Sequence, residues 1–277
     1  MSKARAAARA RDGGCMIRVI ASDMDGTLIP HYGDGVPEEM FRMIRKFREH
    51  GIQFMAASGR QHANLQYMFR PVKDEIDYLC ENGCLVFHDG KLVHQEIMPE
   101  DAALDLLSAF DDKKEYEVLV SGVDTSYVYA TSREFGTFCR DVVHNHVTFV
   151  PTIHDIPEPY FKISGWCSDE KHALQEVTYW DRLFGDLFTV VYSGNGWVDF
   201  SPKGVTKGSA ITWYMNEYGI GKDEVMAFGD NYNDEDMLND VGYSYAMRSA
   251  PEEIRDFCYG TTDNVVATLK DAFRDIL

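Results

Sequence analysis

The sequence predicts an α/β protein in which a Rossmann-like core, built on a parallel sheet, carries an inserted α+β domain. Apolar runs at 17–22, 52–57 and 224–228 alternate with segments of helical periodicity, which is typical of parallel strands joined by helices. Each run ends in a short polar segment, as expected where the carboxyl ends of parallel strands form a binding crevice. This alternation of strands and helices is interrupted near residue 87 and resumes near residue 196.

The first unit of the core reads as strand, helix, strand. The run at 17–22 ends in a glycine turn, and Pro37 then opens a helix at the position where proline is tolerated. Apolar side chains recur along this helix at helical spacing, namely Met40, Met43, Ile44 and Phe47. Gly51 ends the helix as a C-terminal cap, and the strand at 52–57 follows. A further helix to about Phe69 and a short strand at 78–80 complete the unit.

Residues 87–195 are predicted to form the inserted domain. A hairpin signal at His88-Asp89-Gly90 begins it, and short strands then alternate with helices. Strands are expected at 117–120, 126–130, 161–166 and 189–193, and helices near 100–111, 133–144 and 169–184. The core resumes with a helix from Lys207, the strand at 224–228 and a last helix at about 264–273. The core is therefore expected at 16–86 and 196–277.

Composition and charge exclude several classes of function. The formal net charge of −18 over 277 residues argues against a nucleic-acid partner, because phosphate backbones need a basic face. No apolar run approaches the roughly 18 residues of a membrane span. The six cysteines form no Cys-x-x-Cys pair, so we expect buried, reduced thiols and a cytoplasmic protein. Residues 1–15 are rich in Ala and Arg without apolar periodicity and are expected to be a disordered tail.

Four polar segments, called stations below, lie at strand ends or helix starts of the predicted core. They are Asp23/Asp25, Ser58-Gly59, Lys207 and the segment Gly229-Asp230-Asn231-Tyr232-Asn233-Asp234. Each has an ordinary explanation, respectively a turn with solvated acids, a helix cap, a surface lysine and a polar turn. Carboxylates buried without a partner would cost several kcal/mol each, so their clustering at one edge favours a cation site.

These residues resemble the four motifs of the haloacid dehalogenase (HAD) superfamily. The insertion is similar to the larger α+β type of cap domain found there. The stretch 198–208 and the pair Asn82-Gly83 further resemble the Cof-like branch of sugar-phosphate phosphatases. The sequence departs from the branch at Ser58, where threonine is commoner, and at Arg248, where glycine is typical.

The resemblance implies phosphoryl transfer through a covalent intermediate. Asp23 is expected to attack phosphorus and form an aspartyl-phosphate. Asp25 is expected to protonate the leaving group and then to activate water, for which a neighbouring carboxylate would have to raise its pKa. Mg²⁺ is the expected cofactor, held by Asp23, by the main-chain carbonyl of Asp25 and by Asp230. Asp234 is expected to hold a metal-bound water or to orient Lys207.

The phosphoryl group that is transferred needs hydrogen-bond donors around its oxygens. Lys207, the Ser58 hydroxyl and the backbone amides of Gly59 and Met24 are expected to bind it. Asn233 resembles a residue of the branch that contacts substrate. The inserted domain would close over this crevice and select the leaving group, with the loops at 88–90 and 121–124 and the aromatic segment 192–197 as candidates.

The hypothesis is therefore a Mg²⁺-dependent phosphatase acting on a small phosphorylated metabolite such as a sugar phosphate. A phosphomutase or phosphotransferase on sugar phosphates is the alternative within the enzymes. A regulatory module that holds a phospho-aspartate uses similar residues, although such modules are about half this length. A sugar-phosphate binding protein would not need Asp25. The sequence does not indicate the oligomeric state or the individual substrate.

Overall fold

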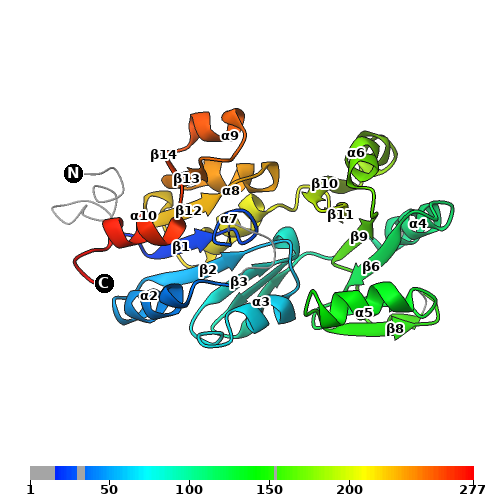
Figure 1. Cartoon of the computed structure of the whole chain (residues 1–277), viewed down its shortest axis with the longest axis horizontal. Helices are drawn as coiled ribbons and strands as arrows, with labels where there is room; N and C mark the ends of the chain where they lie inside the picture. The colour runs from blue at the N-terminus through cyan, green and yellow to red at the C-terminus, as the bar shows by residue number, and fades with distance from the viewer. Residues whose placement is uncertain (1–15, 30–34, 153–154) are drawn as a thin grey trace.

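The computed structural model describes residues 16–29, 35–152 and 155–277, and the predicted disordered tail lies outside them. Two sheets, each with its own helices, lie side by side (Figure 1). The α/β class, with a largely parallel core sheet and a second, mixed sheet, is confirmed. None of the helices in these residues has both the length and the apolar character that a membrane span requires.

The first sheet has eight strands in the order β14-β13-β12-β1-β2-β3-β4-β5. Six of them, from β14 to β3, run parallel, and β4 and β5 continue the sheet in antiparallel fashion. Their bounds are β1 (Val19–Ser22), β2 (Gln53–Ala57), β3 (Asp77–Cys80), β4 (Leu85–His88), β5 (Lys91–Gln95), β12 (Val225–Gly229), β13 (Tyr243–Met247) and β14 (Gly260–Thr262).

Helices cover both faces of this sheet because its strands are apolar on both sides. On one face lie α2 (Glu38–Glu49), α3 (His62–Met68) and α10 (Val265–Ala272). On the other lie α7 (Lys207–Glu217), α8 (Glu235–Asp240) and α9 (Glu252–Phe257). Within β1, Ile20 packs with the first group, and Val19 and Ala21 pack with the second. Short 3₁₀ turns are η1 (Glu81–Gly83), η3 (Lys222–Glu224) and η4 (Tyr232–Asp234).

The second sheet has six strands in the order β10-β11-β9-β6-β7-β8. All neighbours are antiparallel except β7 and β8. The strands are β6 (Glu117–Ser121), β7 (Ser126–Tyr129), β8 (Val147–Val150), β9 (Lys162–Trp166), β10 (Phe188–Gly194) and β11 (Trp197–Pro202). Helices α4 (Glu100–Asp111) and α6 (Glu170–Phe184) pack on one face around Phe110 and Trp180, and α5 (Arg133–Asp141) packs on the other through Phe135.

The strand pairing differs from the predicted boundaries of the insertion at both ends. The hairpin β4–β5 was assigned to the insertion from residue 87, yet β4 pairs with β3 and extends the core sheet. Strand β11, from residue 197, was assigned to the resumed core, yet it pairs with β9 and β10. Hairpin strands carry the same apolar pattern whichever sheet they extend, so the pattern alone did not decide their sheet. Strand β8 was not predicted.

Candidate active site

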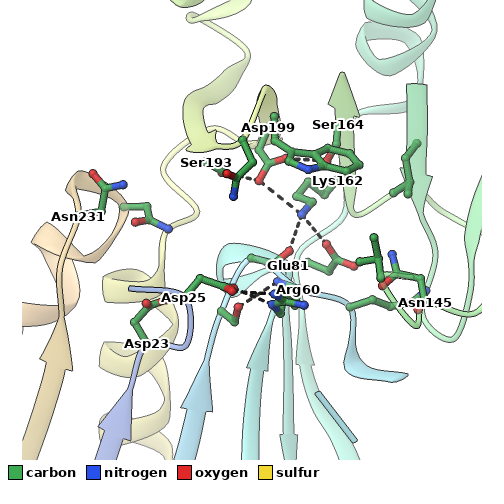
Figure 2. A pocket seen from close by; sticks show the side chains of 18 of the residues that line it. Asp23, Asp25, Arg60, Glu81, Asn145, Lys162, Ser164, Ser193, Asp199 and Asn231 are labelled. Atoms are coloured by element: carbon green, nitrogen blue, oxygen red, sulfur yellow. Dashed lines mark hydrogen bonds and ion pairs between the residues drawn. The ribbon is translucent and has the colours of Figure 1, made fainter. Parts of the chain in front are cut away.

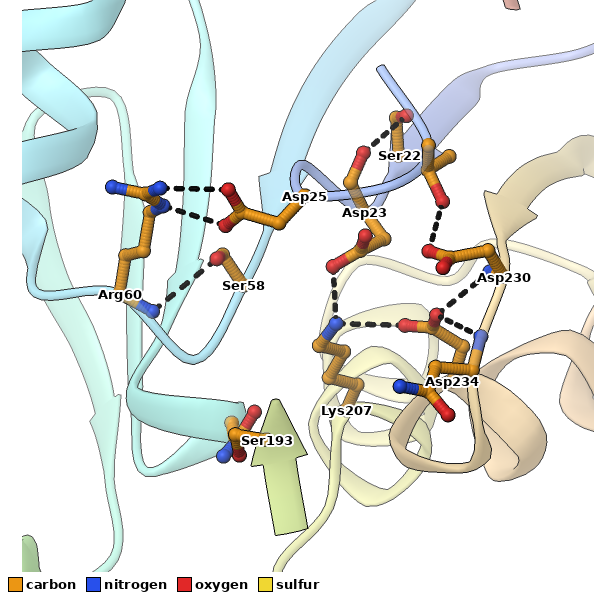
Figure 3. A network of polar contacts seen from close by, with 12 residues as sticks. Ser22, Asp23, Asp25, Ser58, Arg60, Ser193, Lys207, Asp230 and Asp234 are labelled. Atoms are coloured by element: carbon orange, nitrogen blue, oxygen red, sulfur yellow. Dashed lines mark hydrogen bonds and ion pairs between the residues drawn. The ribbon is translucent and has the colours of Figure 1, made fainter. Parts of the chain in front are cut away.

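Two central strands of the core sheet end side by side and bring two acidic residues together. Strands β1 and β12 are parallel neighbours, with Ser22 opposite Phe228. Asp23 follows the first strand, and its backbone N–H donates to the carbonyl of Phe228 at 2.9 Å. Asp230 follows the second strand, and its Oδ1 accepts a hydrogen bond of 2.6 Å from the Thr27 hydroxyl. The register therefore places the two carboxylates at one edge of the sheet (Figure 3).

Lys207 lies between two of the predicted carboxylates (Figure 3). It begins α7, where Thr206 caps the helix by accepting from the Ser209 N–H. Its Nζ donates to Asp23 Oδ1 at 2.5 Å and to Asp234 Oδ1 at 2.7 Å. Asp234 Oδ2 in turn accepts from the backbone N–H of Asp230 at 2.9 Å. The lysine side chain has no exposed surface. It lies beneath Asp23, where these ion pairs hold it.

The cluster has more negative than positive charge. Burial raises the pKa of Asp23 well above its ordinary value, and Asp234 raises it further against the opposing effect of Lys207. Burial, followed by Asp234, raises the pKa of Asp230 to about 6. Burial alone would lower the pKa of Lys207, but Asp23 and Asp234 outweigh it and raise the pKa. A second cation would therefore relieve the repulsion among the carboxylates.

The donor set of this cluster fits Mg²⁺. Asp23, Asp230 and Asp234 each offer a carboxylate oxygen, and these atoms lie within 4.8 Å of one another. Carboxylate oxygens are the ligands that Mg²⁺ prefers in proteins. Gly26 leaves room for this arrangement, because a Cβ at its position would lie 2.4 Å from Asp230 Oδ2. The geometry thus brings together three of the four predicted metal-binding residues.

The carboxylate of Asp25 points away from this cluster and toward Arg60 (Figure 3). Arg60 Nε donates to Asp25 Oδ2 at 2.6 Å, and its second terminal nitrogen donates to Oδ1 at 2.7 Å. The Asp25 side chain is 41% exposed and faces the open part of the site. Any contribution of Asp25 to a metal site would come from its main chain, as the sequence predicted. Arg60 was missed as a site residue, although it directly follows Ser58-Gly59.

A cavity of about 160 Å³ lies above these groups, between the two sheets (Figure 2). Its lining includes most of the predicted site residues: Asp23, Asp25, Ser58, Gly59, Asp230 and Asn233. Lys207 and Asp234 lie buried behind Asp23. The side chain of Met24 is buried in the hydrophobic core, so only its main chain can serve the site. All four stations predicted from the sequence therefore lie at this one site.

The second sheet supplies polar groups, most of them outside the predicted segment 192–197, which contributes Ser193. Lys162, Ser164, Ser193 and Asp199 line the cavity, together with Glu81 from the core. A signal was present, because Lys162 and Ser164 occupy alternate positions of an otherwise apolar strand and so face one side. The prediction that the loop at 88–90 belongs to the inserted domain was wrong. His88 instead bonds Asp77 at 2.7 Å, at the start of β3 and at the end of that strand opposite the site.

The sequence was compared with models of protein families. A model described as haloacid dehalogenase-like hydrolase matches residues 20–267, which include all four stations. The chain belongs to the haloacid dehalogenase-like hydrolases. The second sheet is accordingly the cap domain of this hydrolase.

Known proteins are similar to this HAD hydrolase over most of its length. It is 28% identical over 239 residues to a 5-amino-6-(5-phospho-D-ribitylamino)uracil phosphatase of Escherichia coli K12, covering 84% of this chain and 86% of the relative. A HAD/COF-like hydrolase from Plasmodium vivax superposes with a TM-score of 0.85 at 20% identity, covering 97% and 99% of the two chains. A sugar phosphatase of HAD subclass IIB superposes with a TM-score of 0.75 at 19% identity, covering 94% and 100%.

These findings identify the activity at a coarse level. The chain is a hydrolase of this family, and its relative in Escherichia coli K12 is named as a phosphatase. The alternative of a regulatory phospho-aspartate module does not account for a second, six-stranded sheet that closes a cavity over the acidic cluster.

Proposed function

We propose that the chain is a Mg²⁺-dependent phosphatase that hydrolyses a small phosphorylated metabolite through an aspartyl-phosphate on Asp23. The observation that carries the proposal is the buried ion pair of Lys207 with Asp23 and Asp234, next to Asp230. This arrangement holds the Asp23 carboxylate in place and leaves it at the floor of the cavity. A fixed carboxylate can attack phosphorus in line, which converts one difficult step into two easier ones.

The residues at the cavity have distinct roles in the proposal. Ser58, the Gly59 amide, the Met24 amide and Lys207 bind the oxygens of the phosphoryl group, and Asn233 contacts the substrate. Asp25 exchanges its contact with Arg60 for the leaving-group oxygen, donates a proton to it and then takes one from water. Asp23, Asp230 and the Asp25 carbonyl, with Asp234 beside them, would hold Mg²⁺, which would supply charge to offset the repulsion between nucleophile and phosphate.

The substrate proposed is a phosphomonoester of a polyol or sugar. A relative acts on a phosphoribitylamino compound, as its name states, and polar groups of both sheets line the cavity. A cavity of about 160 Å³ suits a small leaving group. The cytoplasmic location expected from the sequence fits such substrates and stays a prediction.

The test is a phosphate-release screen with Mg²⁺ against hexose phosphates, pentose and polyol phosphates, pyridoxal phosphate and flavin precursors. Wild type should release inorganic phosphate from at least one of them and from p-nitrophenyl phosphate. Asp23→Asn should fold and release none. Conservation of total organic phosphate, with activation by a sugar bisphosphate, would instead assign a phosphomutase.

A further inference from the structure

One lysine of the cap domain is buried against the core at the cavity. Lys162 is the first residue of β9, and its side chain is only 6% exposed. Its Nζ donates to the backbone carbonyl of Gly59 at 2.6 Å and to Glu81 Oε2 at 2.7 Å. Asp199 Oδ2 lies 3.5 Å from the same nitrogen. Figure 2 shows the ammonium group between Asp199 above and Glu81 below.

The hydrogen bonds of Lys162 distinguish two roles. An ammonium group has three N–H donors and no acceptor. Gly59 and Glu81 take two of these donors at short distances, and the Asp199 carboxylate faces the ammonium group at 3.5 Å, so its partners lie within the protein. A lysine that binds substrate directly would keep a donor for the substrate. The geometry therefore favours a positioning role.

Both anions around Lys162 are themselves fixed. Asp199 accepts hydrogen bonds from Ser164 at 2.6 Å, Ser193 at 2.7 Å and Asn82 at 3.0 Å. Glu81 and Asn82 both have left-handed backbone conformations, with φ of 52° and 56°. Such conformations are unfavourable for residues with a side chain and persist where the surroundings determine them. The two sheets thus hold a preformed cradle for one ammonium group.

The group that Lys162 holds belongs to the proposed phosphate-binding segment. Gly59 follows Ser58, whose backbone N–H is fixed by the carbonyl of Leu79 at 2.9 Å. A Cβ at Gly59 would lie 2.8 Å from Asn82 Oδ1, so this segment is also packed tightly against η1. Lys162 adds a bond from the cap to a backbone carbonyl of this segment.

We propose that Lys162 is a positioning residue that makes the geometry of Ser58 and Gly59 depend on the closed position of the cap. The proposal rests on the proposed function, because it assigns this segment to the phosphoryl group. When the cap is closed, Lys162 fixes the Gly59 carbonyl, and the Ser58 hydroxyl and Gly59 amide are held for phosphate. When it is open, the segment loses this bond and the site is less able to stabilise the transition state.

The test compares Lys162→Met with wild type on p-nitrophenyl phosphate and on a pentose 5-phosphate. Misplacement of binding groups costs up to about 100-fold in rate, so kcat should fall by at least tenfold and by the same factor on both substrates. Inhibition by vanadate should weaken in parallel. Lys203→Met is the matched control, because Lys203 also donates to a glycine carbonyl, that of Gly185, but does not line the cavity. Its kcat should match wild type.

Lys162→Met leaves two carboxylates without their cation, so the double variant Lys162→Met/Glu81→Gln is measured as well, with melting temperatures for all. The double variant should be more stable than the single one yet keep the low kcat. Recovery of kcat together with stability would overturn the proposal. So would a loss confined to the pentose phosphate, which would make Lys162 a leaving-group contact, or an unchanged kcat. A wild type that releases no phosphate would instead contradict the proposed function.

Discussion

The ammonium nitrogen of Lys207 lies 2.5 Å from Oδ1 of Asp23, although 184 positions separate the two residues in the sequence. One wholly buried cation thus balances part of a cluster of carboxylates. The pKa of Asp23 is nevertheless raised, because burial and the neighbouring Asp234 outweigh the lysine. The site is built to receive further positive charge.

Removal of the metal should abolish activity. Excess EDTA leaves the carboxylates of Asp23, Asp230 and Asp234 without the cation that their arrangement fits, so repulsion should prevent the approach of phosphate. Phosphate release from p-nitrophenyl phosphate should drop to background and return when Mg²⁺ is added in excess of the chelator. Undiminished turnover in EDTA would rule out the metal assignment.

Gly26→Ala should weaken Mg²⁺ binding through Asp230. Gly26 has φ of +86°, and a Cβ there would lie 2.4 Å from Asp230 Oδ2. Gly51→Ala is a matched control, because its φ is +72° and it has open space around it. Both variants should lose about 1–2 kcal/mol of stability from backbone strain.

Only Gly26→Ala should raise the Mg²⁺ concentration for half-maximal activity, by about tenfold or more. A magnesium titration of both variants measures this. Equal metal dependence of the two variants would separate Gly26 from the metal site.

Arg60→Lys should lower kcat, because it loses the two-pronged contact that orients Asp25. A lysine cannot reproduce two parallel N–H bonds to one carboxylate. We expect kcat to fall about tenfold or more, a part of the 10²–10⁴ that general acid–base catalysis contributes. Arg45→Lys is the control, since Arg45 pairs with Glu75 at 3.2 Å on the surface. If both variants retain full kcat, Arg60 does not serve Asp25.

Asp230 should make the metal-free protein less stable as the pH rises. Its pKa is about 6 in the fold against an ordinary value of 3.8, so the folded state binds the proton more tightly than the unfolded state. The contribution of Asp230 to the free energy of unfolding is then fully present below pH 4 and is lost as the pH rises through 6. In EDTA at pH 7, Asp230→Asn should be more stable than wild type by about 3 kcal/mol, with little difference at pH 4.

Denaturant unfolding of wild type, Asp230→Asn and the control Asp236→Asn, in EDTA at both pH values, measures this difference. Asp236 is an exposed neighbour, so Asp236→Asn controls for the loss of one carboxylate outside the cluster. A wild type as stable as Asp230→Asn at pH 7 would contradict the charge repulsion argued for the site.

The pattern of apolar and polar residues within single segments predicted the core of the fold and the residues that meet at the site. The parallel strands carry continuous apolar runs that end in polar segments, and the register of β1 and β12 then fixes where Asp23 and Asp230 lie. Helix α2 was predicted from its buried stripe and glycine stop, and it ends at Glu49, just before Gly51. These features depend on periodicity within single segments, which a sequence displays directly.

Features that depend on contacts between distant segments were missed. The β4–β5 hairpin was assigned to the wrong sheet because its pairing with β3 is not encoded in its own pattern. The bond from Lys162 to Gly59 joins residues 103 positions apart and two sheets. Arg60 was adjacent to a recognised motif, but only the folded chain shows its contact with Asp25.

Detection of the covalent intermediate tests the central claim most directly. Asp25→Asn should still form the aspartyl-phosphate with an activated substrate such as p-nitrophenyl phosphate but should hydrolyse it slowly. After an acid quench, mass spectrometry of the peptide that contains Asp23 should show the added mass of one phosphoryl group, and the double variant Asp23→Asn/Asp25→Asn should show none. A phosphoryl group on another residue, or an unmodified Asp23 peptide while wild type turns over, would contradict the account.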